Sequence, residues 1–318
     1  MKRSSSYRFT TKKQIPLRRF KMHPEYEEIK NLVEDNLLRF LPETESGSSI
    51  LYDAMKYSLE AGGKRLRPVL LIASCRAAGG SYSDALPYAC AIEFIHTYSL
   101  IHDDHPSMDN DDLRRGKPTN HKVFGDDMAI LAGDGLLNSA MDVMFSDIAR
   151  HADDGSETEK RIRAAREISA SAGVRGMIAG QAADVRPELI RLDDAGKLRY
   201  IHRNKTGALI KAAAAAGALV GGADEDLLGR LSHYGEQIGI AFQIIDDILD
   251  VTGDTKLLGK NTGVDAELGK LTYPSLYGVE KSRALAEKAT DEACRAVENI
   301  KDSEFLKFLA LDLSDRIS

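Results

Sequence analysis

Apolar residues recur at helical spacing along almost the whole chain. From about residue 23 onward they repeat every three or four positions, as at Val33 and Leu37, whereas the alternation of apolar and polar residues that marks a strand is scarce. Paired glycines interrupt the pattern at positions 62, 79 and 221, which is typical of turns between helices. The pattern predicts an all-α fold, a single large bundle of helices.

The first residues of the chain differ from the rest. Residues 1–21 contain eight Lys or Arg and no acidic residue. We interpret residues 1–24 as a basic extension and residues 25–318 as one helical domain. The extension lacks the apolar region of a secretory signal, so we expect a cytoplasmic protein. A targeting peptide for an organelle is the alternative for residues 1–21.

Composition and charge exclude several classes of protein. The net charge of −6 argues against a nucleic-acid binder. The longest apolar stretch, Ala212–Ala223, is too short for a membrane span, so no span is expected. Three widely spaced cysteines (Cys75, Cys90 and Cys294) indicate reduced thiols rather than a disulfide framework or a zinc site.

A polar stripe on an apolar helix is the strongest chemical signal. In the segment "AFQIIDDILDVTGD", Gln243, Asp246, Asp247 and Asp250 follow one another at i, i+3, i+4 and i+7, on one face of the predicted helix. Unpaired carboxylates in so apolar a segment would cost several kcal/mol. The segment contains no basic residue, so a divalent metal is a better partner for the carboxylates than a buried Lys or Arg.

A second aspartate cluster lies about 140 residues earlier, in "LIHDDHPSMDNDDLRRGKPTNH". It ends an apolar helix on which His96, Ser99 and Asp103 share one face. Pro106 makes continued regular helix unfavourable, so the chain can curl and bring Asp109 toward Asp103 and Asp104. Oxygen-only ligands of this kind suit Mg²⁺, which shares phosphate oxygens with its substrates. The following Arg114 and Arg115 suit phosphate as well.

Basic residues occur where a polyphosphate would need them. "EAGGKRLRP" contains Lys64, Arg65 and Arg67 after a Gly-Gly turn, and "RNKTGAL" contains Lys205 and Thr206. A third stretch has Lys256, Lys260 and Lys270 among several glycines, as in a cationic flap.

These motifs together resemble the trans-prenyltransferases, the isoprenyl diphosphate synthases. "DDHPSMD" is similar to the first aspartate-rich motif of the family and "DDILD" to the second, and "GGKRLRP", "KTG" and "GKLTYP" occur in the family's order. The resemblance covers residues 25–318. It implies an all-α barrel around a deep central cavity, usually a homodimer.

The resemblance also implies a role for each motif residue. Two Mg²⁺ ions would be held by Asp103, Asp104 and Asp109, and a third by Asp246 with Asp247 and Asp250. The diphosphate of an allylic substrate would be bound by Arg114, Lys205, Thr206, Gln243, Lys260 and Lys270. The diphosphate of isopentenyl diphosphate would be bound by Gly63, Lys64, Arg67, His96 and Arg115. In such enzymes the allylic diphosphate ionises, and isopentenyl diphosphate adds five carbons.

The resemblance bears on product length too. The residues four and five positions before the first aspartate, Ser99 and Tyr98, would close the floor of the product tunnel. An aromatic Tyr98 implies farnesyl diphosphate, with geranyl or geranylgeranyl diphosphate as alternatives. His105 stands where the family commonly has Leu. We expect it to point outward, the alternative being a titratable group beside the metals, and we assign no role to His102 or His121.

Two other functions share part of the pattern. A class I terpene cyclase also ionises an allylic diphosphate on Mg²⁺, but it needs no isopentenyl site and usually has Asn, Ser or Glu in its second metal motif. A non-catalytic partner subunit tends to lose an aspartate motif, and both motifs are complete here. The residues therefore favour a synthase.

Overall fold

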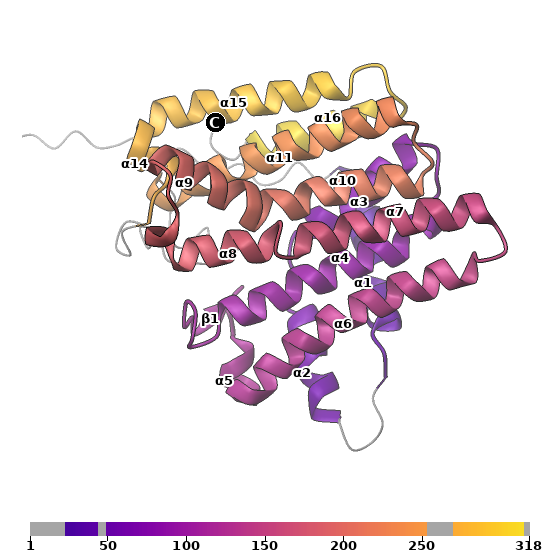
Figure 1. Cartoon of the computed structure of the whole chain (residues 1–318), viewed down its shortest axis with the longest axis horizontal. Helices are drawn as coiled ribbons and strands as arrows, with labels where there is room; N and C mark the ends of the chain where they lie inside the picture. Colours follow the sequence, from indigo (N-terminus) through magenta and orange to yellow (C-terminus); the bar gives the residue numbers. More distant parts are fainter. Residues whose placement is uncertain (1–22, 44–48, 253–269, 315–318) are drawn as a thin grey trace, which may run out of the picture.

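The computed structural model describes residues 23–43, 49–252 and 270–314. Nearly all the regular structure in these residues is helical (Figure 1), which confirms the all-α prediction. The elements are α1 (Pro24–Phe40), α2 (Ser49–Leu59), α3 (Leu66–Ala77), α4 (Tyr82–Asp103), β1 (Leu113–Arg114), β2 (Lys117–Pro118), α5 (Asn120–Phe124), α6 (Asp126–Arg150), α7 (Gly155–Ala172), α8 (Met177–Val185), η2 (Pro187–Leu189), α9 (Asp194–Ile201), η3 (His202–Gly207), α10 (Ala208–Val220), α11 (Glu225–Thr252), α14 (Tyr273–Tyr277), α15 (Val279–Ala296) and α16 (Ser303–Ser314).

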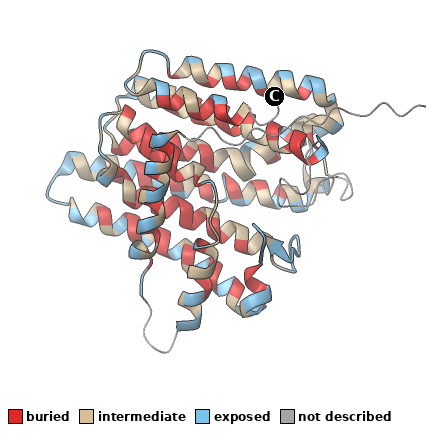
Figure 2. Ribbon diagram, turned by 180° about the vertical axis from the view of Figure 1, so that it is seen from behind, coloured by how far each residue is buried: buried red, intermediate tan, exposed pale blue. Residues whose placement is uncertain are grey.

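The core runs along the middle of the bundle (Figure 2), where α3, α4, α10 and α11 are buried over most of their length. The small residues of α10 allow a close approach to α3. A side chain at Gly217 would collide with the carbonyl group of Leu71. Helix α4 begins with a capping box between Ser81 and Asp84, in which the Ser81 hydroxyl accepts a hydrogen bond from the Asp84 N–H.

A short hairpin follows the first aspartate motif and was not predicted. Strands β1 and β2 are antiparallel, with Arg114 opposite Lys117. The two turn residues, Arg115 and Gly116, both have positive φ (53° and 76°), as a tight two-residue hairpin turn requires. Arg114 therefore lies on strand β1 and Arg115 in the turn, so the chain changes direction between these two residues.

One described helix, α6, is long and apolar enough by length and composition to cross a membrane, and the sequence analysis overlooked it. Of its most apolar 18-residue window, 44% is buried inside the protein. Core helices of soluble proteins pass the same test, and α6 packs against α4 along the bundle. Composition alone is therefore weak support for a span.

Candidate active site

The first aspartate motif closes back on the end of α4. The helix ends at Asp103, three residues before Pro106, as the sequence predicts. The N–H of Asp109 donates to the carbonyl oxygen of Asp103 at 2.9 Å, and Asn110 adopts positive φ (53°). The loop thus returns Asp109 to the end of α4. Figure 1 shows the hairpin strand β1, α8 and α14 at this same end of the bundle.

Two lysines lie among the carboxylates at this end. The Nζ of Lys205 donates to Asp184 at 2.8 Å and lies 3.9 Å from a carboxylate oxygen of Asp103. Lys270 lies 4.0 Å from both Asp109 and Asp184. Burial raises the pKa of Asp103 to about 6, although the Lys205 ammonium lowers it and Asp109 raises it further. The Lys205 ammonium therefore favours the ionised form of the buried Asp103 carboxylate.

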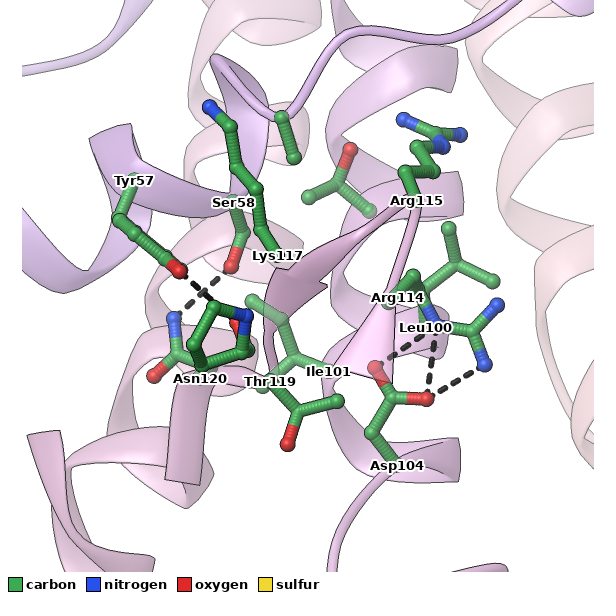
Figure 3. Close-up of a pocket in the computed structure, with 13 residues that line it drawn as sticks. Tyr57, Ser58, Leu100, Ile101, Asp104, Arg114, Arg115, Lys117, Thr119 and Asn120 are labelled. Atoms are coloured by element: carbon green, nitrogen blue, oxygen red, sulfur yellow. Dashed lines mark hydrogen bonds and ion pairs between the residues drawn. The ribbon is translucent and has the colours of Figure 1, made fainter. Parts of the chain in front are cut away.

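Figure 3 shows a small cavity beside this motif, where Asp104 and Arg114 face each other. The Nε of Arg114 lies 2.7 Å from both carboxylate oxygens of Asp104. Asp104 is buried, with 3% of its surface exposed. Arg114, expected at the allylic diphosphate, is thus bound to one of the expected metal ligands.

The second aspartate motif lies on α11, as the sequence predicts. Asp247 accepts a hydrogen bond from the N–H of Tyr273 at 2.8 Å, and the Nε2 of His202 lies 3.7 Å from its other oxygen. Asp250 is buried, and its Oδ2 has no hydrogen-bond partner. Asp247 therefore anchors the start of α14, while Asp250 has an unsatisfied oxygen.

His202, the first residue of η3, lies beside the second aspartate motif, with its Nε2 3.7 Å from an oxygen of Asp247. Burial lowers the pKa of His202 to about 4, against the opposing effect of the Asp184 and Asp246 carboxylates. Asp184 also binds Lys205, which in turn approaches Asp103. The carboxylates from the ends of α4, α8 and α11 thus form one cluster.

A cationic cavity of about 350 Å³ is lined by every residue expected to bind isopentenyl diphosphate: Gly63, Lys64, Arg67, His96 and Arg115. The guanidinium group of Arg115 donates to the carbonyl of Gly62, and it lies so close to Gly63 that a Cβ there would be 2.7 Å from its Cζ. The Nε of Arg67 is buried without a hydrogen-bond partner. The cavity is therefore built to receive an anion.

Local charge determines the protonation state of the histidine in this cavity. Burial and four nearby arginines (Arg67, Arg115, Arg114 and Arg65) hold the pKa of His96 well below its usual range. Burial also lowers the pKa of Arg67 to about 10, with Glu93 opposing the shift and Arg115 adding to it. His96 is therefore neutral at physiological pH and can donate a hydrogen bond without adding charge.

A buried ion pair supports the same cavity. Arg65 has positive φ (52°) and is 4% exposed. Its Nη1 lies 2.6 Å from Glu93, and its Nη2 donates to the carbonyl of Leu59 at 2.6 Å. Arg65 thus ties the chain after the Gly-Gly turn to Glu93 of α4 and to the end of α2.

Sequence reasoning missed Gln181 and Asp184. Both side-chain polar atoms of Gln181 are buried without a hydrogen-bond partner, and Asp184 binds Lys205 as described. The segment "GQAADV" places the two at i and i+3 on α8, so they share a helix face. This i, i+3 spacing is the feature of the sequence that could have identified Gln181 and Asp184 as candidate site residues.

Other expected residues are less informative. Lys256 and Lys260, like the basic segment 1–21, lie outside the described residues. Thr206 is on η3 and Gln243 on α11, both half-buried. Tyr98 is 6% exposed, its hydroxyl has no partner, and its ring contacts that of His102 at 5.7 Å. The Ser99 hydroxyl donates to the carbonyl of His96.

The expectation that His105 points outward is wrong. Its Nε2 is buried without a partner, and its ring lies 6.1 Å from that of His121. Its Nδ1 accepts a hydrogen bond from the N–H of Ser107 at 3.2 Å. The loop after Pro106 folds over the ring, and this local turn could not be read from the residue spacing.

The donor set fits Mg²⁺ that arrives with a phosphate ligand. Among the described residues, no group of three His, Cys, Asp or Glu is close enough to hold a metal ion alone. The available donors are carboxylate oxygens, including the unsatisfied Oδ2 of Asp250. Mg²⁺ usually keeps several waters and binds one or two carboxylates plus substrate phosphates. The residues therefore fit shared rather than purely protein coordination.

Comparisons with known proteins point in one direction. A family model described as polyprenyl synthetase matches residues 48–308. The large subunit 1 of a heterodimeric chloroplastic geranylgeranyl pyrophosphate synthase of Arabidopsis thaliana is 52% identical over 245 residues, which cover 76% of this chain and 65% of that protein. The chain thus spans slightly less than two thirds of that relative.

Two further proteins are similar. A chloroplastic geranylgeranyl pyrophosphate synthase of Catharanthus roseus is 50% identical over 243 residues, covering 76% of this chain and 67% of the relative. The crystal structure of a FPP/GFPP synthase from Zymomonas mobilis superimposes with a TM-score of 0.78 at 36% identity, covering 90% of this chain and 96% of that one.

Proposed function

Because the chain belongs to the polyprenyl synthetase family, we propose that it condenses isopentenyl diphosphate with an allylic diphosphate. One observation carries this proposal: a cationic cavity adjoins a cluster of carboxylates. Arg115 lines the cavity with Lys64 and Arg67, and it also lines the small cavity of Asp104 and Arg114 (Figure 3). Two anionic substrates, one of them accompanied by metal ions, match this pair of sites.

The allylic diphosphate belongs at the carboxylate cluster. Bound Mg²⁺ would act as a Lewis acid that stabilises negative charge on the departing diphosphate, and Asp103, Asp109, Asp246 and Asp250 are the carboxylates that would hold it. Lys205 and Lys270 would exchange their carboxylate contacts for contacts with the diphosphate. Asp104 and Asp247, each already paired within the protein, would position these groups.

Isopentenyl diphosphate belongs in the cationic cavity. Lys64, Arg67 and Arg115 would bind its diphosphate with charge-assisted hydrogen bonds, and His96 would add a neutral donor. This arrangement orients the C=C of isopentenyl diphosphate toward the allylic carbon. New C–C bond formation, loss of the allylic diphosphate and loss of one proton then give a chain five carbons longer.

The relatives favour geranylgeranyl diphosphate as the product over the farnesyl diphosphate expected from the sequence. Both relatives described above are named geranylgeranyl pyrophosphate synthases. A C15 product is the second candidate, supported by the buried Tyr98 five residues before Asp103.

A product assay tests the proposal. Purified protein with Mg²⁺ and labelled isopentenyl diphosphate receives dimethylallyl, geranyl or farnesyl diphosphate, and the dephosphorylated products are sized. A C20 alcohol from all three primers supports the first candidate, and a C15 alcohol from only the two shorter primers supports the second. Asp246→Asn should abolish incorporation, whereas Asp226→Asn, an exposed carboxylate on the same helix, should not. Absence of incorporation by the parent protein contradicts the proposal.

The setting of the enzyme follows from the relatives and the surface. The names of the two plant relatives support the organelle alternative for this chain.

One of these relatives is a subunit of a heterodimer, so the partner of this chain is either a second copy or a related subunit. We expect a second copy, on the exposed apolar side chains of α6 and α7, including Leu131, Phe145 and Ile162.

A further inference from the structure

A second cavity, of about 720 Å³, adjoins the site already described and shares His202 and Tyr273 with it. Its walls come from the end of α7, from α9, from η3, and from the facing turns of α10 and α11. In Figure 1, α9, α10 and α11 lie above α8, and α7 continues in line with α8. The volume falls within the range of typical small-molecule sites.

The cavity is cationic although the chain is acidic. Four basic side chains (Arg175, Arg199, Arg203 and Lys211) and two carboxylates (Glu167 and Glu236) line it, while the whole chain carries a net charge of −6. Only Arg203 among the four has a carboxylate within ion-pair distance in the described part of the chain, Glu236 at 3.8 Å. Three cations therefore face the cavity without an acidic partner.

The rest of the lining is apolar or aromatic. Leu192 and Ile240 contribute aliphatic surface, and Tyr200 and Tyr273 contribute rings. Leu192 and Tyr200 are 48% and 39% exposed, so an apolar group that covers them would remove them from water. Guanidinium groups bind phosphate oxygens bidentately. A phosphate joined to a compact apolar group would satisfy both parts of the lining.

The cavity and the carboxylate cluster adjoin at His202 and Tyr273, which line the cavity and contact Asp247, but their basic side chains differ. His202, Arg203, Asn204 and Gly207 of this element line the cavity, whereas Lys205 reaches Asp184 at 2.8 Å. A π-helical turn of this kind is rare and is often found at functional sites. Ligands in the two sites therefore need not compete for the same basic side chains.

We propose that this cavity is a binding site for a phosphate monoester with an apolar tail, distinct from the site that would hold the two diphosphate substrates. The interaction requires no catalysis, so its test is independent of the proposed function. A soluble phosphate ester and the headgroup of an anionic lipid share the required chemistry.

The test measures binding of 1-naphthyl phosphate by titration calorimetry. We expect binding to weaken about tenfold in Lys211→Ala and in Arg199→Ala, since each removes one charge-assisted contact. Lys288→Ala removes an exposed cation on α15 and should bind like the parent protein. Binding should also persist when Mg²⁺ and inorganic diphosphate are present in excess. Thermal melting checks that each variant is folded.

Three results would overturn the proposal: no binding of the probe, equal binding by all variants, or complete displacement by Mg²⁺ and inorganic diphosphate. If the probe binds as expected, co-sedimentation with vesicles that contain phosphatidic acid distinguishes the two possible sources of the ligand. Co-sedimentation that is lost in Lys211→Ala identifies a lipid headgroup, whereas probe binding without co-sedimentation identifies a soluble ester.

Discussion

The position of Lys205 depends on two glycines, and this dependence gives the sharpest test of the site. Gly180 on α8 lies directly against η3: a Cβ at this position would be 2.5 Å from the Cα of Lys205 and 2.6 Å from the carbonyl carbon of Asn204. On the other side, a Cβ at Gly239 of α11 would be 3.0 Å from the Cα of Gly207. Backbone therefore holds η3 from both sides.

Gly180→Ala should displace Lys205. An ordinary contact needs about 3.4 Å, so η3 must move by at least about 0.9 Å to clear the Cα of Lys205, and further to clear its backbone N, which is nearer still. Helix α11 blocks retreat on the far side of η3. A misplacement of about 1 Å in a catalytic group can cost about 100-fold in rate. We expect kcat to fall about 100-fold and the free energy of unfolding to fall by about 1–3 kcal/mol, the usual cost of overpacking.

Two matched variants calibrate the measurement. A Cβ at Gly229, also on α11, meets nothing within 4 Å, so Gly229→Ala should keep full activity and stabilise the helix by up to about 1 kcal/mol. The kcat of Gly239→Ala should lie between those of Gly180→Ala and Gly229→Ala. The kinetics are measured well below the melting temperature of each variant. Parent-like kcat in Gly180→Ala, in a folded protein, would refute the reasoning.

Four further predictions concern single side chains. Tyr98→Ala should lengthen the product if the ring closes the tunnel, and an unchanged product distribution would count against that role. Affinity for Mg²⁺ with inorganic diphosphate, measured by calorimetry, should fall up to about tenfold between pH 6 and pH 5, because burial raises the pKa of Asp103 to about 6 and protons compete with the metal; Asp103→Asn should flatten this dependence. Glu93→Gln should lower the free energy of unfolding, measured with urea, by about 3–5 kcal/mol, because it removes the buried carboxylate partner of a buried guanidinium. Its control, Glu34→Gln, alters a partly exposed partner of the same guanidinium and should cost less than about 1 kcal/mol. Phe145→Glu places a charge on the exposed apolar face of α6 and should give a monomer by light scattering, whereas an unchanged mass would argue for a different interface.

Helical spacing made part of the site predictable. Asp246, Asp247 and Asp250 stand out because they follow Gln243 at i+3, i+4 and i+7 within a run of apolar residues, and the structure has them on one helix. Pro106 likewise predicted where α4 ends. Both predictions rest on local features, namely the spacing of residues along one helix and the conformational restriction imposed by one proline. Neither requires knowledge of the tertiary fold.

Contacts between distant segments were not predictable in this way. Asp104 and Arg114 are both recognisable as chemical groups, but their pairing depends on the hairpin that turns Arg114 back toward α4. Asp184 is one acidic residue among many until η3 brings Lys205 to it. The choice of partner therefore needs the packing of α8, η3 and α11.

The two lysines at the carboxylate cluster show why the sequence could identify the charged residues but not which of them pair in the folded protein. Without other cations, Asp103, Asp109 and Asp184 would repel one another at the end of the bundle, and Lys205 and Lys270 offset that repulsion. A diphosphate accompanied by Mg²⁺ brings both signs of charge and can take over both sets of contacts. Binding then exchanges ion pairs rather than creating them, so the net affinity should depend more on geometry than on the number of charges. This is the reason that a shift of η3 by about 1 Å, with every charge retained, is expected to cost more than the loss of an exposed cation elsewhere.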